Sequence, residues 1–149
     1  MNSSTDLFAL ITENLDTSRF REINWTGTFH DYLALVTEDP NILRDAYQRI
    51  YDMVIAQGVE IIDERTRLES YPFFSDPSGG GKEAVFGLEP QLMKLVNFFK
   101  SAALHYGTEK RVLLLHGPVG SAKSTIVRLL KKGLEAYSET PEGALYTFS

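Results

Sequence analysis

The sequence contains no cysteine, which excludes disulfide bonds, thiolate metal sites and cysteine nucleophiles. Long hydrophobic runs are also missing, since the longest apolar stretches are the five-residue segments Leu7–Ile11 and Tyr32–Val36. A membrane-spanning helix needs about 20 apolar residues, so neither segment could cross a bilayer. The N-terminus lacks the basic start and apolar stretch of a signal peptide. We therefore expect a cytoplasmic protein with no membrane partner.

Basic residues are in the minority. The 149 residues include 15 Lys and Arg against 20 Asp and Glu, which gives a formal net charge of −5. Non-specific nucleic-acid binding needs a basic face that displaces counterions, so we expect no nucleic-acid partner. The hydrophobic content of 43% is enough to build a core. The length suits one domain, or one domain plus an incomplete second.

The N-terminal part of the sequence is predicted to be helical. A short helix is expected over Asp6–Asn14. Thr28 followed by Asp31 resembles a capping box at the start of a second helix. Asp39-Pro40 is typical of an N-cap and first helical residue, and Gly58 would end the helix that begins there. We therefore predict a helical N-terminal region over residues 1–70.

A change of composition follows. Residues 71–84 include two prolines and three consecutive glycines, which is typical of a loop or linker. Within it, Gly79–Lys82 superficially resembles a phosphate loop, but the segment lacks both a preceding strand and a following hydroxyl. We therefore interpret it as a flexible linker, and we place the start of a second domain, residues 85–149, after it.

The second domain has the pattern helix, strand, loop, helix, strand. Apolar residues from Leu92 to Tyr106 recur at helical spacing. Val112–Leu115 is a short apolar run expected for a strand buried on both sides. Lys123–Ala136 is predicted as a helix and Ala144–Phe148 as a further strand. Strand, helix and strand form a βαβ unit, so we predict an α/β fold that opens a parallel sheet and leaves it incomplete.

A phosphate loop is predicted between the strand and the helix. The pattern G-x-x-x-x-G-K-[ST] is nearly matched there by Gly117, Pro118, Val119, Gly120, Ser121, Ala122, Lys123, Ser124 and Thr125. Backbone N–H groups and a helix N-terminus would hold the phosphates. Lys123 would reach the β- and γ-phosphates of ATP, Ser124 would bind Mg²⁺, and Thr125 would lie near the α-phosphate. The alternative is a chance glycine turn.

Ala122 departs from this motif, which has glycine immediately before the lysine. A methyl group there could crowd the phosphates, or strain the backbone if the position needs a positive φ. The Gly-Ser-Ala-Lys-Ser string nevertheless resembles the alanine variant of some AAA+ branches that use ATP, so we expect binding to survive.

On the helix that follows, Arg128, Lys131 and Lys132 form a basic face. Such a face is usually solvated, and in an AAA+ ring it could instead meet an acidic neighbour.

Taken together, the motifs resemble the PrkA-type serine protein kinases, which carry an AAA+ module near the N-terminus. The resemblance covers nearly the whole chain and follows its order. The matching segments are Trp25–Leu33 (WTGTFHDYL), Ala46–Met53 (AYQRIYDM), Phe73-Phe74, Val85–Glu89 (VFGLE), Arg111–Thr125, Gly133–Glu135 (GLE) and Glu142–Tyr146 (EGALY).

The resemblance implies functional roles. Phe86 and Gly87 match the AAA+ segment that lies against the adenine ring, so they are candidate base contacts; the alternative is a helix-entry turn with a buried Phe. Family members are much longer than this chain. The Walker-B acidic strand end, the sensor residues and the arginine finger are all missing here, so we expect no catalytic residue in this chain and no ATP turnover by it alone.

The sequence therefore predicts the ATP- and Mg²⁺-binding N-terminal portion of a PrkA-like protein. The full-length relative would phosphorylate protein serine or drive ATP-powered remodelling, with a protein substrate or the rest of an AAA+ assembly as partner. Assembly of the full-length form into a homo-oligomer is left open. The rival hypothesis is a non-catalytic interaction module that binds a partner through its helical region and open sheet edge.

Overall fold

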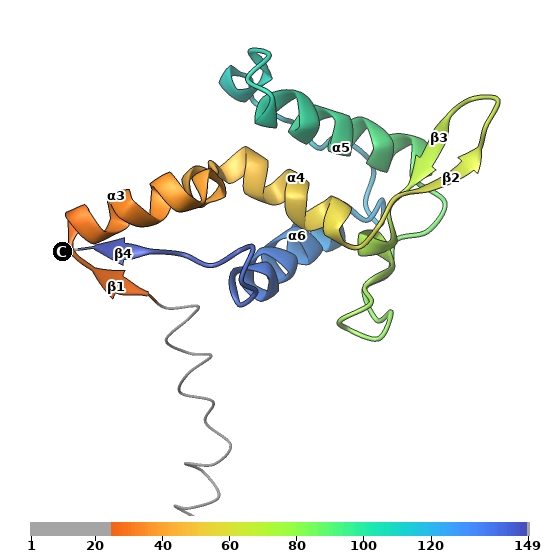
Figure 1. Cartoon of the computed structure of the whole chain (residues 1–149). Helices are drawn as coiled ribbons and strands as arrows, with labels where there is room; N and C mark the ends of the chain where they lie inside the picture. The colour runs from red at the N-terminus through yellow and green to blue at the C-terminus, as the bar shows by residue number, and fades with distance from the viewer. Residues whose placement is uncertain (1–24, 149) are drawn as a thin grey trace, which may run out of the picture. The chain divides into compact units, whose positions relative to one another are not determined.

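The computed structural model describes residues 25–148 (Figure 1). They fall into two compact units, one formed by 25–42 with 138–148 and the other by 43–137. The helix predicted over Asp6–Asn14 lies outside the described residues. Within them, no helix is long and apolar enough to cross a membrane.

The first unit joins the two ends of the described chain. Strands β1 (Thr26–Gly27) and β4 (Thr147–Phe148) pair in parallel, with Thr26 opposite Thr147. The Thr147 N–H also donates to the Trp25 carbonyl at 3.1 Å. The strand predicted over residues 144–148 is thus formed in its last two described residues, and its partner is β1.

Helix α3 (Phe29–Glu38) begins with the predicted capping box. The Asp31 carboxylate accepts hydrogen bonds from the Thr28 hydroxyl at 2.6 Å and from the Thr28 N–H at 3.0 Å. The Thr28 hydroxyl in turn accepts from the Asp31 N–H at 3.3 Å. These bonds to the charged form lower the pKa of the Asp31 carboxyl, with the hydroxyl making the largest contribution.

The helix predicted to begin at Asp39-Pro40 begins later than predicted. Residues Pro40–Leu43 form only a 3₁₀ helix, η1, and α4 spans Ala46–Ala56. A second capping box explains the later start, because Asp45 accepts from the Gln48 N–H at 2.8 Å and Gln48 accepts from the Asp45 N–H at 2.9 Å. The Asp39 carboxylate instead accepts from the backbone N–H and from the side-chain Nδ2 of Asn41, both at 2.9 Å.

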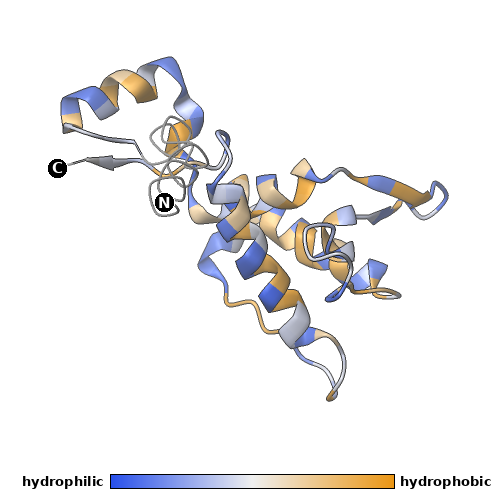
Figure 2. Ribbon diagram, turned by 90° about the horizontal axis from the view of Figure 1, so that it is seen from below, coloured by the Kyte–Doolittle hydropathy of each residue, from blue (hydrophilic) through white to orange (hydrophobic). Residues whose placement is uncertain are grey.

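The second unit packs three helices around one hydrophobic core. Helices α4, α5 (Glu89–Ala103) and α6 (Lys123–Ser138) turn apolar faces inward (Figure 2). Shorter elements complete it, namely the antiparallel strands β2 (Glu60–Asp63) and β3 (Leu68–Ser70) and the 3₁₀ helices η2 (Pro72–Ser75) and η3 (Thr108–Lys110). Its buried residues are Met53, Val54, Tyr71, Phe73, Phe74, Val85, Leu92, Leu95, Val96, Phe99, Ile126 and Leu129.

The segment interpreted as a flexible linker contributes to this core. Phe74 is 1% exposed, and its carbonyl accepts from the Val85 N–H at 2.9 Å. Asp76 is 3% exposed with a left-handed φ of +55°, and its carboxylate accepts from the N–H groups of Gly79 and Glu83 at 3.1 and 3.0 Å. The prolines and glycines therefore shape an ordered connection in residues 71–84. The predicted domain boundaries at 70 and 85 remain a prediction.

The strand predicted over Val112–Leu115 is not formed. These residues are extended but unpaired within the described chain, with Val112 95% exposed and Leu114 80% exposed. A strand needs a neighbouring backbone to accept its hydrogen bonds, and the described residues supply none here. The predicted βαβ unit is therefore absent from residues 25–148. Its helix is present as α6, which ends two residues beyond the predicted Ala136.

Candidate phosphate-binding site

The predicted phosphate loop, Gly117–Thr125, runs into the first turn of α6 (Lys123–Ser138). That helix begins at Lys123, and the Ile126 N–H donates to the Ala122 carbonyl at 2.8 Å in its first turn. Before it, the Ser121 N–H and hydroxyl both donate to the Pro118 carbonyl, at 3.3 and 2.8 Å. The loop is therefore a closed turn placed against the N-terminus of a 16-residue helix.

The Lys123 ammonium group donates hydrogen bonds to three residues of the loop. Nζ donates to the Gly117 carbonyl at 2.7 Å, the Pro118 carbonyl at 2.6 Å and the Ser121 hydroxyl at 2.8 Å. An ammonium group has three protons, and the three acceptors use all of them. The positive charge therefore sits within the loop, between its two ends.

Two loop residues need a left-handed backbone. Gly120 has φ of +84° and Ala122 has φ of +58°. A Cβ at Gly120 would have no atom within 4 Å, so glycine is needed there for its backbone freedom. The sequence raised the question of whether the position before the lysine needs a positive φ, and the structure shows that it does. Ala122 therefore holds a conformation that costs an L-residue free energy.

Gly117 has a different role, because its space is limited. A Cβ at Gly117 would lie 2.7 Å from the Ser121 hydroxyl oxygen and 3.9 Å from Lys123 Nζ. A side chain there would displace the hydroxyl that accepts from the lysine. The first glycine of the motif thus keeps the loop closed around Lys123.

The two hydroxyls that follow the lysine lie in the first turn of α6. Ser124 is exposed, and Thr125 is partly buried with its hydroxyl 3.4 Å from Nη2 of Arg128. Val119, at the tip of the loop, is fully exposed. Among the described residues, no group of three or more His, Asp or Glu is placed to hold a metal ion.

The basic face of α6 meets an acidic side chain from the same unit. Arg128 Nε lies 2.8 Å from one carboxylate oxygen of Glu83, and Lys132 Nζ lies 2.7 Å from the other. The hydrogen bond from Lys132 contributes most to lowering the pKa of the Glu83 carboxyl, against a smaller opposing effect of desolvation. Two of the three basic residues are therefore ion-paired within the chain, across separations of 45 and 49 residues.

The candidate base contacts lie just after Glu83. Gly87 has φ of +72°, and its N–H donates to the Glu89 carboxylate at 3.2 Å, which forms the entry turn of α5. The alternative for these residues was a helix-entry turn with a buried Phe. The turn is present, but the Phe86 side chain is 77% exposed.

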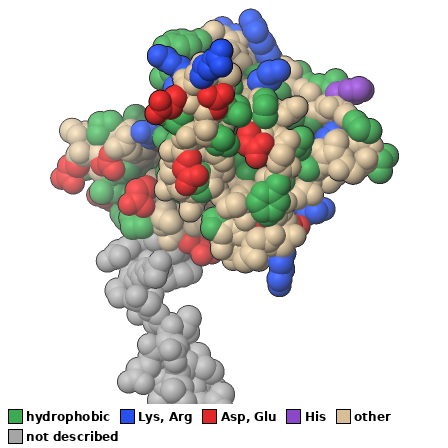
Figure 3. Space-filling view, turned by 90° about the vertical axis from the view of Figure 1, so that its right-hand side faces the viewer, with side chains coloured by type: hydrophobic (Ala, Val, Ile, Leu, Met, Phe, Trp, Pro, Cys, Tyr) green, Lys and Arg blue, Asp and Glu red, His purple; other side chains and the backbone are tan. Residues whose placement is uncertain are grey.

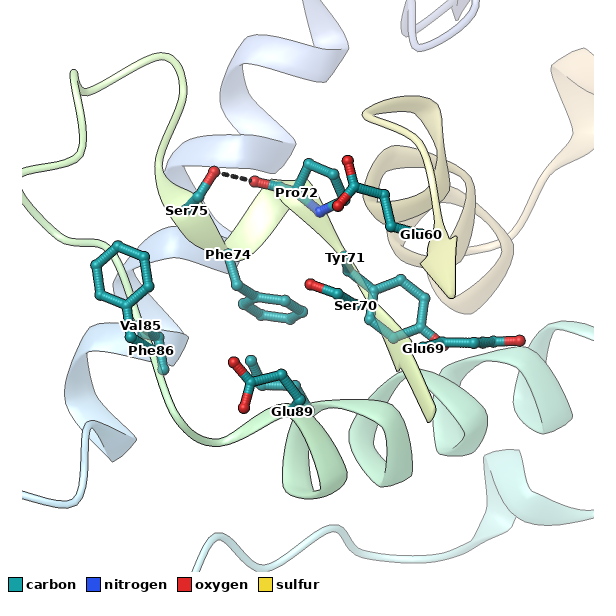
Figure 4. A pocket seen from close by; sticks show the side chains of 11 residues that line it. Glu60, Glu69, Ser70, Tyr71, Pro72, Phe74, Ser75, Val85, Phe86 and Glu89 are labelled. Carbon is teal, nitrogen blue, oxygen red and sulfur yellow. Dashed lines mark hydrogen bonds between the residues drawn. The ribbon is translucent and has the colours of Figure 1, made fainter. Parts of the chain in front are cut away.

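Phe86 lines a pocket of about 230 Å³ (Figure 4). Phe74, Val85 and Leu92 contribute apolar side chains to its lining, and Glu60, Glu69 and Glu89 contribute carboxylates. Tyr71 also lines it; burial, and then a hydrogen bond to Glu69, raise the pKa of the Tyr71 hydroxyl. The full lining is Glu60, Glu69, Ser70, Tyr71, Pro72, Phe74, Ser75, Val85, Phe86, Glu89 and Leu92. None of Gly117–Thr125 belongs to this pocket, so it does not join the base contacts to the loop.

The residue that sequence reasoning missed is Glu83. It lies in the segment interpreted as a linker, and only its proximity in the fold brings it to α6. The available signal was the spacing of Arg128 and Lys132, four residues apart on one helical face, which indicates that a single carboxylate could pair with both.

On the surface drawn in Figure 3, acidic, basic and hydrophobic side chains all occur on the same face.

Comparison with known proteins agrees with the resemblance seen in the sequence. A family model described as the PrkA AAA domain matches residues 27–148. The "ATP-dependent protease PrkA" of Bacillus subtilis (strain 168) is 42% identical over 127 residues, which are 85% of this chain and 18% of the relative. An "Uncharacterized protein in gldA 5'region" of Geobacillus stearothermophilus is 35% identical over 91 residues, 60% of this chain and 84% of that protein.

No solved structure matches the chain. The chain spans less than a fifth of the length of the Bacillus subtilis relative. The family match, however, covers nearly all of the described residues, including the phosphate loop and the segment around Phe86. The chain therefore belongs to the PrkA AAA-domain family.

Proposed function

We propose that this chain binds ATP with Mg²⁺ through Gly117–Thr125 and is the nucleotide-binding N-terminal portion of a longer PrkA-like protein. Membership of an AAA-domain family supports nucleotide binding. The observation that carries the proposal is the position of Lys123 Nζ, which is held between Gly117, Pro118 and Ser121 at the N-terminus of α6.

The residues present fit the chemistry of a triphosphate. Phosphate oxygens are acceptors, and the loop offers an ammonium group, successive backbone N–H groups and the positive end of a long helix. Lys123 would hold the β- and γ-phosphates, the Gly120–Lys123 amides would cradle them, and Ser124 would bind Mg²⁺. Because the three acceptors of Lys123 are neutral oxygens, phosphate would replace them with acceptors that carry a negative charge, so that both partners of each bond would be ionised.

Titration calorimetry tests this proposal directly. The chain is titrated with ATP and Mg²⁺ beside Lys123→Ala, with Lys131→Ala as the matched control because it removes an exposed lysine from the same helix. We expect saturable binding that Lys123→Ala abolishes and Lys131→Ala preserves, with a thermal melt showing that each variant is folded. Absence of binding by the folded parent chain would refute the proposal.

The activity of the longer protein is a separate proposal. The resemblance implies a serine protein kinase, whereas the name of the Bacillus subtilis relative describes an ATP-dependent protease. We propose an ATP-driven activity on protein substrates in the cytoplasm, with this chain supplying the phosphate contacts. Incubating the full-length protein with a protein substrate and γ-labelled ATP separates the two, because a kinase transfers label and a protease shortens the substrate.

The rival function, a non-catalytic interaction module, is favoured by one observation. Val112 and Leu114 are exposed apolar side chains in an extended segment that has no strand partner among the described residues. An unpaired extended segment of this kind can accept a strand from a partner chain. If the folded chain binds no nucleotide but captures a longer PrkA-family protein, the interaction module becomes the better account.

A further inference from the structure

We propose that Glu83 is a positioning residue that fixes the segment carrying Phe86 and Gly87 to the helix of the phosphate loop, and so controls how much the adenine base adds to triphosphate binding. This inference rests on the proposed function and on the base contact that the family resemblance implies for Phe86 and Gly87. It concerns the discrimination between ATP and a bare triphosphate, whereas the proposed function concerns triphosphate binding itself.

The first support is the pair of contacts that Glu83 makes with α6. One carboxylate oxygen lies 2.8 Å from Arg128 Nε and the other 2.7 Å from Lys132 Nζ. Because Arg128 and Lys132 are one helical turn apart, two oxygens on one carboxylate hold two adjacent points of the helix. Such a contact restrains both the distance and the rotation of the 83–87 segment against α6.

The second support is that the backbone around Glu83 is itself held. The Glu83 N–H donates to the buried Asp76 carboxylate at 3.0 Å. Two residues later, the Val85 N–H donates to the carbonyl of Phe74 at 2.9 Å, and Phe74 belongs to the core. Glu83 therefore connects two ordered parts of the unit.

The third support is that the same arginine reaches the phosphate loop. Nη2 of Arg128 lies 3.4 Å from the Thr125 hydroxyl, while its Nε contacts Glu83. Phe86 follows Glu83 by three residues along the chain. Glu83 thus adds a polar connection between the segment of the candidate base contacts and the helix of the candidate phosphate contacts, beside the core that Val85 shares with Ile126 and Leu129; the pocket beside Phe86 does not include the loop.

Removing the Glu83 charge should have two opposite effects. The segment around Phe86 loses its attachment to α6, which weakens binding of the base. At the same time Arg128 and Lys132 lose their counter-charge, which favours a polyanion nearby. ATP affinity should therefore fall relative to the affinity for a triphosphate that has no base, and that ratio is what the experiment measures.

The test compares ATP with inorganic tripolyphosphate, both with Mg²⁺, by calorimetry on the full chain. In Glu83→Gln we expect the preference for ATP over tripolyphosphate to fall by about three- to tenfold, the size expected from losing two exposed ion pairs. Tripolyphosphate itself should bind equally well or more tightly. Glu135→Gln is the control, because it removes an exposed carboxylate from α6 away from the loop, and its preference should equal that of the parent chain.

Arg128→Gln provides the second variant, since it breaks the same contact from the opposite side. It should also lower the preference for ATP, but it should weaken tripolyphosphate binding, because it removes a positive charge. The inference is overturned if Glu83→Gln changes both ligands by the same factor, or if the preference is unchanged in both variants. Failure of the parent chain to bind either ligand refutes the proposed function, and this inference with it.

Discussion

Ala122 offers a sharp test of the loop geometry, because it holds a φ of +58° immediately before Lys123. We predict that Ala122→Gly stabilises the chain, although glycine usually destabilises an ordered segment. The left-handed conformation costs an L-residue about 1–2 kcal/mol, and glycine adopts it without that cost. Glycine also restores the residue that the phosphate-loop motif has at this position.

The magnitude follows from one favourable and two unfavourable contributions. Against the relief of about 1–2 kcal/mol, glycine adds about 0.4–1 kcal/mol of conformational entropy to the unfolded chain, and it removes the Ala122 methyl group, which packs against the core. We therefore expect a net gain of at most about 1 kcal/mol in the free energy of unfolding. For a chain of this length that corresponds to a rise in Tm of at most roughly 4 °C.

Denaturant unfolding and thermal melting of Ala122→Gly measure the gain. The matched control is Ala136→Gly, an identical substitution at an exposed position inside α6, the helix that Ala122 precedes. There glycine should destabilise by about 0.5–1 kcal/mol, because the backbone is helical and alanine is the better residue. The two variants should therefore have opposite signs. If Ala122→Gly is as destabilising as Ala136→Gly, the left-handed conformation before Lys123 is incorrect.

Three further predictions concern packing and charge. Gly133→Ala should lower Tm despite its better helix propensity, because a Cβ there would lie 2.5 Å from Phe73 Cε2 and 2.9 Å from Met53 Sδ; a raised Tm would contradict this packing. Phe74→Ala should cost about 3–5 kcal/mol in denaturant unfolding, whereas a flexible linker would tolerate it. Glu83 contributes stability above its unfolded pKa of about 4.5, which is lost as the pH falls through its lower folded pKa. The Tm difference between the parent chain and Glu83→Gln should therefore be present at neutral pH and vanish in acid; a difference that persists in acid would assign it to packing.

Features set by neighbouring residues were predictable from the sequence. The capping box of Thr28 and Asp31 needs only a spacing of three residues, and it forms as expected. Helix α6 was predicted from its apolar spacing and begins at the predicted residue, Lys123. The start of α4 was predicted at Asp39-Pro40, whereas the capping box of Asp45 and Gln48, which that prediction did not consider, sets it.

Features that depend on distant residues were not predictable in the same way. The apolar run Val112–Leu115 has the composition of a strand, but a strand forms only beside another backbone. Conversely, residues 71–84 have the composition of a linker, yet Phe74 belongs to the hydrophobic core that residues of α4, α5 and α6 share, and Asp76 is 3% exposed. Proline and glycine indicated where the chain turns, and they carried no information about whether the side chains between them pack.

The site shows the same division. The loop residues could be chosen from the motif, because backbone amides, a lysine and a hydroxyl are arranged by consecutive positions. What the motif could not give is the contact between Glu83 and α6, the helix of the predicted phosphate loop, since Glu83 is 45 residues from Arg128. Phe86 and Gly87 were found only through the family resemblance.

The strain at Ala122 and the ion pairs of Glu83 bear differently on the proposed nucleotide binding. The left-handed alanine stores free energy in the loop whether or not a phosphate is bound, so by itself it lowers stability without changing affinity. It affects affinity only if phosphate binding changes the conformation at Ala122. The Glu83 contacts differ in kind, because they act on the relation between two groups that would touch different ends of one ligand. Ala122→Gly should therefore alter mainly the free energy of unfolding, and Glu83→Gln mainly the choice of ligand.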